Sequence, residues 1–323
     1  MGRISNILIF VFFFLSMFFC RAQELYPLNE PASSIPKGVL GVRVFGNTYQ
    51  EISTQRNMAA VRIMYGVTPR LSVMATTAIS NHHNKSLPAD LVNHIHVGNQ
   101  TFFFTQNIQR GVKYPYLLNG LHLYAKYRFL SIDGKHRHLR MALYSEWSNT
   151  KSAHDEAEPN LMDDSKGFGS GLIITALKDH FAISLTSGFI LSGAYKDMAP
   201  LGVGYDDWVP TEVHYGNALI YNLSLGYLLY PRNYTDYHQS NWNIYLEFMG
   251  KAYEEGKLIQ NGVALTHEGP AMKAGNYIEV HPGLQRIINS NLRIEISAGF
   301  PLLSRSYIRF YPVISVGVQQ YFY

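Results

Sequence analysis

Hydrophobic and polar residues alternate along most of the chain, with the period of two that belongs to a β-strand whose faces meet different surroundings. Within 118–131, for example, Leu121 and Leu123 share one face, whereas Lys126 and Arg128 share the other. The pattern predicts about twelve strands. They cover residues 38–49, 57–67, 70–80, 118–131, 138–150, 167–177, 180–194, 213–230, 241–252, 275–287, 291–300 and 311–323.

The connections between these strands alternate between short and long, which is typical of a transmembrane barrel with short periplasmic turns and long extracellular loops. A soluble β-sandwich also alternates along its strands, but it has no reason to alternate its loop lengths. The short connections are 68–70, 178–179 and 289–291, and the long ones are 81–117, 151–166, 195–212 and 253–274. We therefore expect an all-β fold, a transmembrane antiparallel up-and-down β-barrel.

The strand count has one alternative. The connection 81–117 contains the apolar run Phe102–Phe104, which would supply a further hairpin and raise the count to fourteen, or fold into the lumen as a constriction. The chain has 323 residues, of which 15% are charged and 14% aromatic. Beyond residue 20 no run of about 20 apolar residues occurs, which argues against helical membrane spans.

The first 22 residues have the pattern of a secretory signal peptide. Arg3 precedes an apolar stretch at 7–19, and Cys20 and Ala22 are the small residues that a signal peptidase reads. Cleavage after Ala22 would remove the only cysteine, so we expect no disulfide. The mature chain would carry 25 basic and 23 acidic residues, after Arg3 and Arg21 are subtracted, and this balance suggests no nucleic-acid partner.

The remaining chain divides into two parts. Residues 23–37 contain three prolines and are expected to form an extended periplasmic lead-in, and residues 38–323 form the barrel. The chain ends in an aromatic run at Tyr321–Tyr323, which resembles the assembly signal of outer-membrane proteins. We expect the outer membrane of a Gram-negative bacterium as the location. The expected partners are outer-membrane lipid, lipopolysaccharide, the barrel assembly machinery and an unidentified small solute.

Two segments, 65–73 and 120–129, resemble parts of the outer-membrane barrel family named for phenol-degradation meta-pathway transporters. The resemblance implies an outer-membrane transporter that passes small, often aromatic, molecules. The tyrosine-rich, cysteine-poor style also resembles outer-membrane proteins of the Bacteroidetes group.

Charged residues on the inward faces are the first candidates for function. Opposed basic and acidic rows in a narrow barrel either select solutes or pair with one another and close the lumen, and the sequence leaves both interpretations open. The predicted lumen-lining residues are Arg43, Arg62, His122, Lys126, Arg128, Arg140, Glu146, Glu247, Lys251, Glu279, His281, Arg293 and Glu295.

Histidines in the long loops offer a weaker hypothesis, a Zn or Cu site at His82, His83, His94 and His96. No cysteine accompanies them, and we predict no metal and no cofactor. The acidic residues of the next long connection are expected to form a solvated loop. They are Glu156, Glu158, Asp163 and Asp164.

The segment 238–241 is similar to the His-x-Ser-Asn segment of the outer-membrane phospholipase, in which the histidine is the base and the serine the nucleophile. The similarity would assign these roles to His238 and Ser240, but Trp242 replaces the glycine that follows the motif and Ala252 stands where the orienting asparagine would fall.

Three functions follow from these patterns. The preferred one is a passive channel or transporter for small solutes, hydrophobic or aromatic ones included, and not an enzyme. The second is a phospholipase-like enzyme that uses His238 and Ser240. The third is a closed barrel with a structural or secretion-accessory role.

Overall fold

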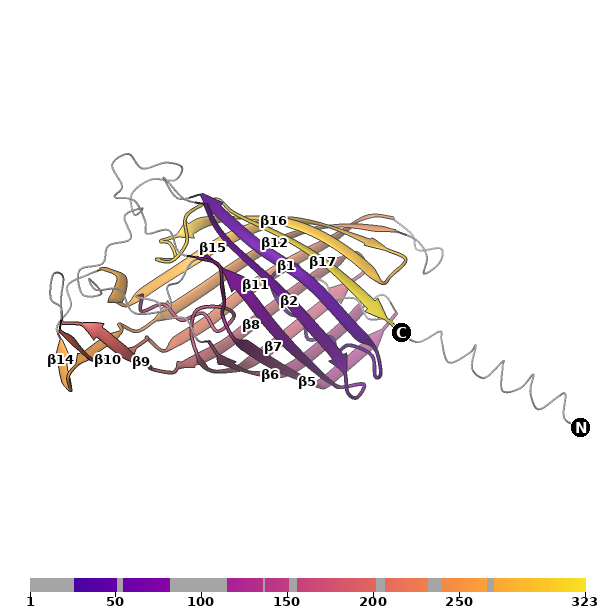
Figure 1. Cartoon of the computed structure of the whole chain (residues 1–323). Coiled ribbons are helices and arrows are strands. Elements are labelled where there is room, and N and C mark those ends of the chain that lie inside the picture. Colours follow the sequence, from indigo (N-terminus) through magenta and orange to yellow (C-terminus); the bar gives the residue numbers. More distant parts are fainter. Residues whose placement is uncertain are drawn as a thin grey trace, which may run out of the picture.

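A computed structural model describes residues 26–50, 55–81, 115–135, 137–150, 156–201, 207–231, 240–265 and 270–323. Twelve long strands form one antiparallel barrel, which Figure 1 shows from the side. They are β1 (Leu40–Gln50), β2 (Gln55–Gly66), β3 (Leu71–Ser80), β5 (Leu121–Gly134), β6 (Arg137–Asn149), β7 (Gly167–Lys178), β8 (Phe181–Ser192), β11 (Ala218–Tyr230), β12 (Asn241–Tyr253), β15 (Gly275–Ile288), β16 (Leu292–Leu303) and β17 (Val313–Phe322).

The barrel is closed because the last strand pairs with the first. Strand β17 pairs with β1 from Leu40 opposite Phe322 to Thr48 opposite Ile314, and β1, β2 and β3 pair in turn. All twelve predicted strands are confirmed, with ends that differ by a few residues. Strand β3 pairs directly with β5, and the two-residue strand β4 (Leu117–Leu118) is an addition at the end of β3. The barrel wall therefore has twelve strands, and the 82–114 part of the connection considered for a further hairpin lies outside the described residues.

The outer surface of the wall is apolar, and the inner surface is polar. Leu143, Leu185 and Ile296 are about half exposed on the outside, whereas Lys126 and Glu247 on the inside are almost completely buried. A closed barrel with this alternation satisfies its backbone hydrogen bonds internally and presents apolar side chains to lipid. The chain is therefore an outer-membrane β-barrel of the Gram-negative type. No helix within the described ranges is long and apolar enough to cross a membrane.

A small second sheet lies beyond the barrel end that is opposite the C-terminus (Figure 1). The sequence predicts loops for most of these residues, at 195–212 and 253–274, and assigns 213–214 to a barrel strand, because strands this short show little alternation. They are β9 (Tyr195–Pro200), β10 (Trp208–His214), β13 (Lys257–Gln260) and β14 (Val263–Leu265), followed by a 3-10 turn at Pro270–Met272. Ala199, Val213 and Leu258 form its buried core with Tyr215 and Met272.

The expected signal peptide, residues 1–22, lies outside the described residues and stays a prediction. The segment that follows differs from expectation. Residues 26–36 are extended, but they lie inside the barrel and not before it, since their backbone contacts strands on opposite sides of the wall.

The lipid-facing assignment predicts a position-dependent cost of adding charge. Leu185→Arg, near the middle of β8, should destabilise the barrel in lipid vesicles by about 2–4 kcal/mol, because the guanidinium would face the bilayer core. The matched control is Leu201→Arg, an exposed leucine beyond the barrel wall, which should change stability by less than about 0.5 kcal/mol. Folding titrations in urea measure both. Equal costs at the two positions would contradict the assignment.

Candidate functional site

The predicted lumen-lining residues all lie on the inward faces of their strands. Their burial differs with depth in the barrel. Nine are buried: Arg43, Arg62, His122, Lys126, Glu247, Glu279, His281, Arg293 and Glu295. Four are half-buried: Arg128, Arg140, Glu146 and Lys251. Six of them bind one of two segments of the chain that occupy the lumen: Arg43, Arg62, Lys126, Arg140, Glu247 and Lys251.

The first of these is residues 26–36, which we call the lumen segment. Its backbone amides donate to side chains of the wall, because an extended segment inside a barrel has no neighbouring strand to pair with. The N–H groups of Leu28 and Asn29 donate to the Glu247 carboxylate at 2.9 and 3.0 Å. Ala32 N–H donates to Thr175 Oγ1 at 2.9 Å. Three prolines, which have no N–H, reduce the number of amides that need such partners.

Ion pairs also hold the lumen segment in the barrel. Glu30 pairs with Arg62 at 2.9 Å and with Lys126 at 3.2 Å. Burial opposes its charge, but Lys126, Arg62 and Arg43 outweigh that effect and hold the pKa of Glu30 at about 2. Lys126 also donates to the Pro31 carbonyl at 2.7 Å. The expected periplasmic lead-in is thus wrong for residues 26–36, because buried basic residues of the wall require an acidic partner that the lumen segment provides.

The second lumen-filling element is residues 156–165, which we call the loop segment, between β6 and β7. Glu158 is 1% exposed and accepts hydrogen bonds from Lys251 at 3.1 Å and Tyr277 at 2.7 Å. Ser306 donates to the same carboxylate at 2.7 Å. The prediction of a solvated acidic loop was wrong, since Glu156, Glu158, Asp163 and Asp164 are all buried.

The connection between β16 and β17 contributes Arg309. Its Nη1 donates to the buried Glu279 carboxylate at 2.6 Å, and Glu279 also contacts His281 Nε2 at 3.0 Å and accepts from the Tyr311 hydroxyl. Burial opposes the charge of Arg309, but Glu279 outweighs it and raises the pKa of the guanidinium. Arg309 lies in a connection between strands, where the alternation of apolar and polar residues gives no sign of an inward position.

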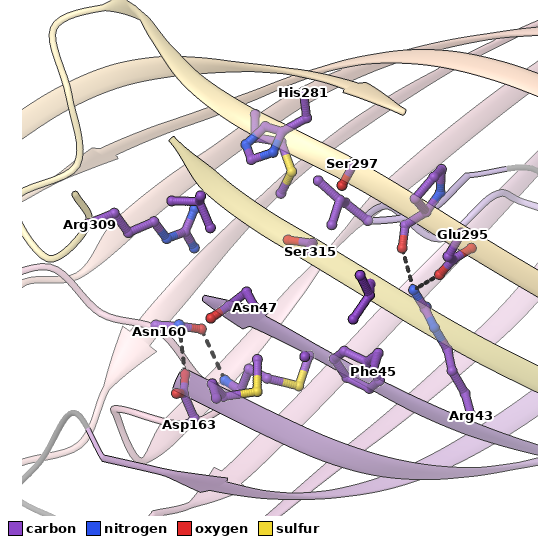
Figure 2. A pocket seen from close by; sticks show the side chains of 18 of the residues that line it. Arg43, Phe45, Asn47, Asn160, Asp163, His281, Glu295, Ser297, Arg309 and Ser315 are labelled. Atoms are coloured by element: carbon purple, nitrogen blue, oxygen red, sulfur yellow. Dashed lines mark hydrogen bonds and ion pairs between the residues drawn. The ribbon is translucent and has the colours of Figure 1, made fainter. Parts of the chain in front are cut away.

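A cavity of about 200 Å³ lies between the lumen segment and the loop segment, and Figure 2 shows side chains around it. Phe45, Met58 and Met162 supply apolar surface, and Arg43 and Arg309 supply cationic surface. A second cavity of about 160 Å³ adjoins it. The two share four lining residues: Asn160, Met162, Met249 and Arg309.

The remaining candidate residues fall largely outside the described part of the chain. His82, His83, His94, His96 and His238 lie there. Ser240 is described and directly precedes β12. The described residues include no cluster of three or more groups that could hold a metal ion.

Comparison with known proteins identifies the fold of the chain but not its family. No protein-family model matches the chain, and no curated protein matches it. An outer-membrane channel from Pseudomonas putida F1 is similar, with a TM-score of 0.51 at 12% identity over 93% of this chain and 100% of that one. The chain therefore shares its fold with an outer-membrane channel.

Two other solved structures align more distantly. Escherichia coli outer-membrane phospholipase A gives a TM-score of 0.34 at 8% identity, over 94% of each chain. The toluene transporter TodX of Pseudomonas putida gives 0.32 at 12% identity, over 88% of this chain and 86% of that one. Neither likeness is close enough to support a functional argument.

The ion pairs of Glu30 predict a pH dependence of stability. Its folded pKa of about 2 lies below the ordinary value of 4.5, so the ionised carboxylate stabilises the protein above pH 4.5 and this contribution is lost as the pH falls toward 2. Glu30→Gln should lower the free energy of unfolding by about 3 kcal/mol at pH 7, because it leaves Arg62 and Lys126 without their acid.

Unfolding in detergent micelles, followed for wild type and Glu30→Gln from pH 7 to pH 2, measures this difference. The difference should stay constant down to about pH 4.5 and shrink below it. A difference that grows on acidification would contradict the assignment of Glu30.

Proposed function

We propose that this protein is a passive outer-membrane channel for small solutes, hydrophobic or aromatic ones included, and that passage requires displacement of the lumen segment. The cavity between the two lumen-filling segments carries the proposal. Its volume of about 200 Å³ exceeds the roughly 150 Å³ that suffices to bind benzene. The fold shared with an outer-membrane channel supports the same function.

The way in which the lumen segment is held supports its displacement. It is attached through side chains of the wall, such as Glu247, Thr175 and Ser72, and none of its residues belongs to a strand of the barrel. It can therefore leave without breaking the hydrogen bonds that close the wall. A neutral contact such as that of Ala32 with Thr175 exchanges for water at a net cost of about 1 kcal/mol, whereas the charged contacts of Glu30 and Glu247 cost more and hold the segment in place.

A closed barrel with a structural role would also have a filled lumen. The apolar side chains of the cavity favour the channel, because a lumen filled only for stability would be close-packed and would leave no space of this size. The phospholipase function gains no support, since His238 lies outside the described residues.

Conductance across planar bilayers tests the channel. Glu30→Gln/Glu247→Gln should raise the fraction of time that the protein conducts by at least tenfold over wild type, because the lumen segment loses both acidic anchors. Deletion of residues 26–36 should give a steadily conducting state.

The matched control is Glu212→Gln in the small second sheet beyond the barrel end. It removes an acid that pairs with Lys196 at 2.9 Å, and it should conduct as wild type does. If wild type, the double variant and the deletion all fail to conduct while they run as folded barrels on heat-modifiability gels, the channel function is rejected.

A further inference from the structure

One guanidinium lies at the junction of every cavity described in the lumen. Arg309 and Asn160 line the cavities of about 200 and 160 Å³, and they also line a third of about 40 Å³ near Arg56. Figure 2 shows the Arg309 side chain directed from its connection into the cavity of about 200 Å³. A solute that moves along these cavities passes Arg309.

Arg309 has unused hydrogen-bond donors that face this space. Nη1 donates to Glu279, whereas Nε and Nη2 have no hydrogen-bond partner within the described part of the chain. The side chain remains 24% exposed although the residue lies inside the barrel mouth. Glu279 is occupied by Arg309, His281 and Tyr311, so its position is fixed and it holds the guanidinium in one orientation.

The other charged groups of the cavity of about 200 Å³ form ion pairs or hydrogen bonds. Arg43 pairs with Glu295, and Arg62 pairs with Glu30. Asp163 accepts a hydrogen bond from Asn160 at 3.0 Å. Arg43 Nε also has no hydrogen-bond partner, but that atom is buried. Arg309 is therefore the partly exposed cation of this cavity, and its Nε and Nη2 stay available to a ligand.

The side chains around Arg309 favour a ligand whose remaining part is apolar. Phe45, Met58, Met162, Met249 and Val313 line the same cavity and provide an apolar surface. Methionine side chains adapt to flat or irregular apolar groups. The volume is sufficient for one aromatic ring or a short aliphatic chain.

We infer that the cavity at Arg309 binds a small monocarboxylate with an apolar body, such as a single-ring aromatic acid. The carboxylate accepts two parallel hydrogen bonds from Nε and Nη2, the geometry that suits a guanidinium, and the apolar body lies against Phe45 and the methionines. This inference rests on the proposed function, because it makes the cavity a binding site on the route of the solute.

Calorimetric titration of the purified, detergent-solubilised protein tests the inference without requiring transport. Benzoate is the probe, and benzyl alcohol is a neutral probe of similar size. Wild type should bind benzoate at least tenfold more tightly than benzyl alcohol. Equal affinity for the two probes would overturn the inference, because Arg309 would then contribute nothing to recognition.

The variants isolate the guanidinium. Arg309→Gln/Glu279→Gln removes the ion pair as a unit, so no buried charge is left without a partner. It should lose at least tenfold in benzoate affinity and keep its affinity for benzyl alcohol. Arg309→Lys, which keeps the charge but not the planar donor edge, should weaken benzoate binding about threefold to tenfold. The matched control is Arg286→Gln on the outer face, which should bind benzoate as wild type does.

Each result separates the inference from the proposed function. Unchanged benzoate affinity in both Arg309→Lys and the double variant overturns the inference, even if the protein conducts. Benzoate binding that depends on Arg309 supports the inference, even if no variant conducts and the channel function is rejected. If the double variant does not fold, the benzoate affinity of Arg309→Lys alone tests the inference.

Discussion

In a closed twelve-stranded barrel, every second side chain of the wall points into the lumen. Here those side chains include arginines, lysine and glutamates that are nearly inaccessible to solvent, and each buried charge without a partner would cost several kcal/mol. The wall supplies some partners itself, as in the contact of His122 with Glu146 at 2.9 Å. The remaining partners come from the lumen segment, from the loop segment and, for Glu279, from Arg309 in the connection between β16 and β17. This need for charge pairing organises the whole lumen.

The two segments meet the requirement from opposite ends. The lumen segment brings Glu30 to Arg62 and Lys126, and the loop segment brings Glu158 to Lys251. Because no residue of either segment belongs to a strand of the wall, the wall stays complete whether or not they are in place. The space left between them has apolar and cationic surfaces, so the arrangement that satisfies the wall also forms the candidate binding site.

The wall could be predicted from the sequence because each strand alternates between apolar residues, which face lipid, and polar residues, which face the lumen. The alternation of Leu121 and Leu123 with Lys126 needs no knowledge of any other strand. The lumen could not be predicted in this way. Glu247 accepts a hydrogen bond from the backbone N–H of Asn29, which is 218 residues away in the sequence. No local sequence pattern near either residue predicts this contact. Three prolines in 23–37 indicated an extended segment, but not its position.

The same limit explains the loop segment and Arg309. A run of acidic residues such as Glu156 and Glu158 is typical of a solvated loop, and only the distant Lys251 and Tyr277 make burial favourable. Arg309 lies between two strands, where alternation carries no signal, so its position at the junction of the cavities is visible only in the folded chain.

The proposed channel requires that the lumen segment, which lies across the barrel, moves before solutes can pass. Cysteines at Asn29 and Ser224, whose side chains are 3.0 Å apart, can be joined by a short thiol-reactive bridge that a reductant cleaves. Planar-bilayer conductance of this double variant in KCl is the direct measurement. We expect that the bridged protein does not conduct and that conductance appears after cleavage. Equal conductance before and after cleavage would contradict this expectation.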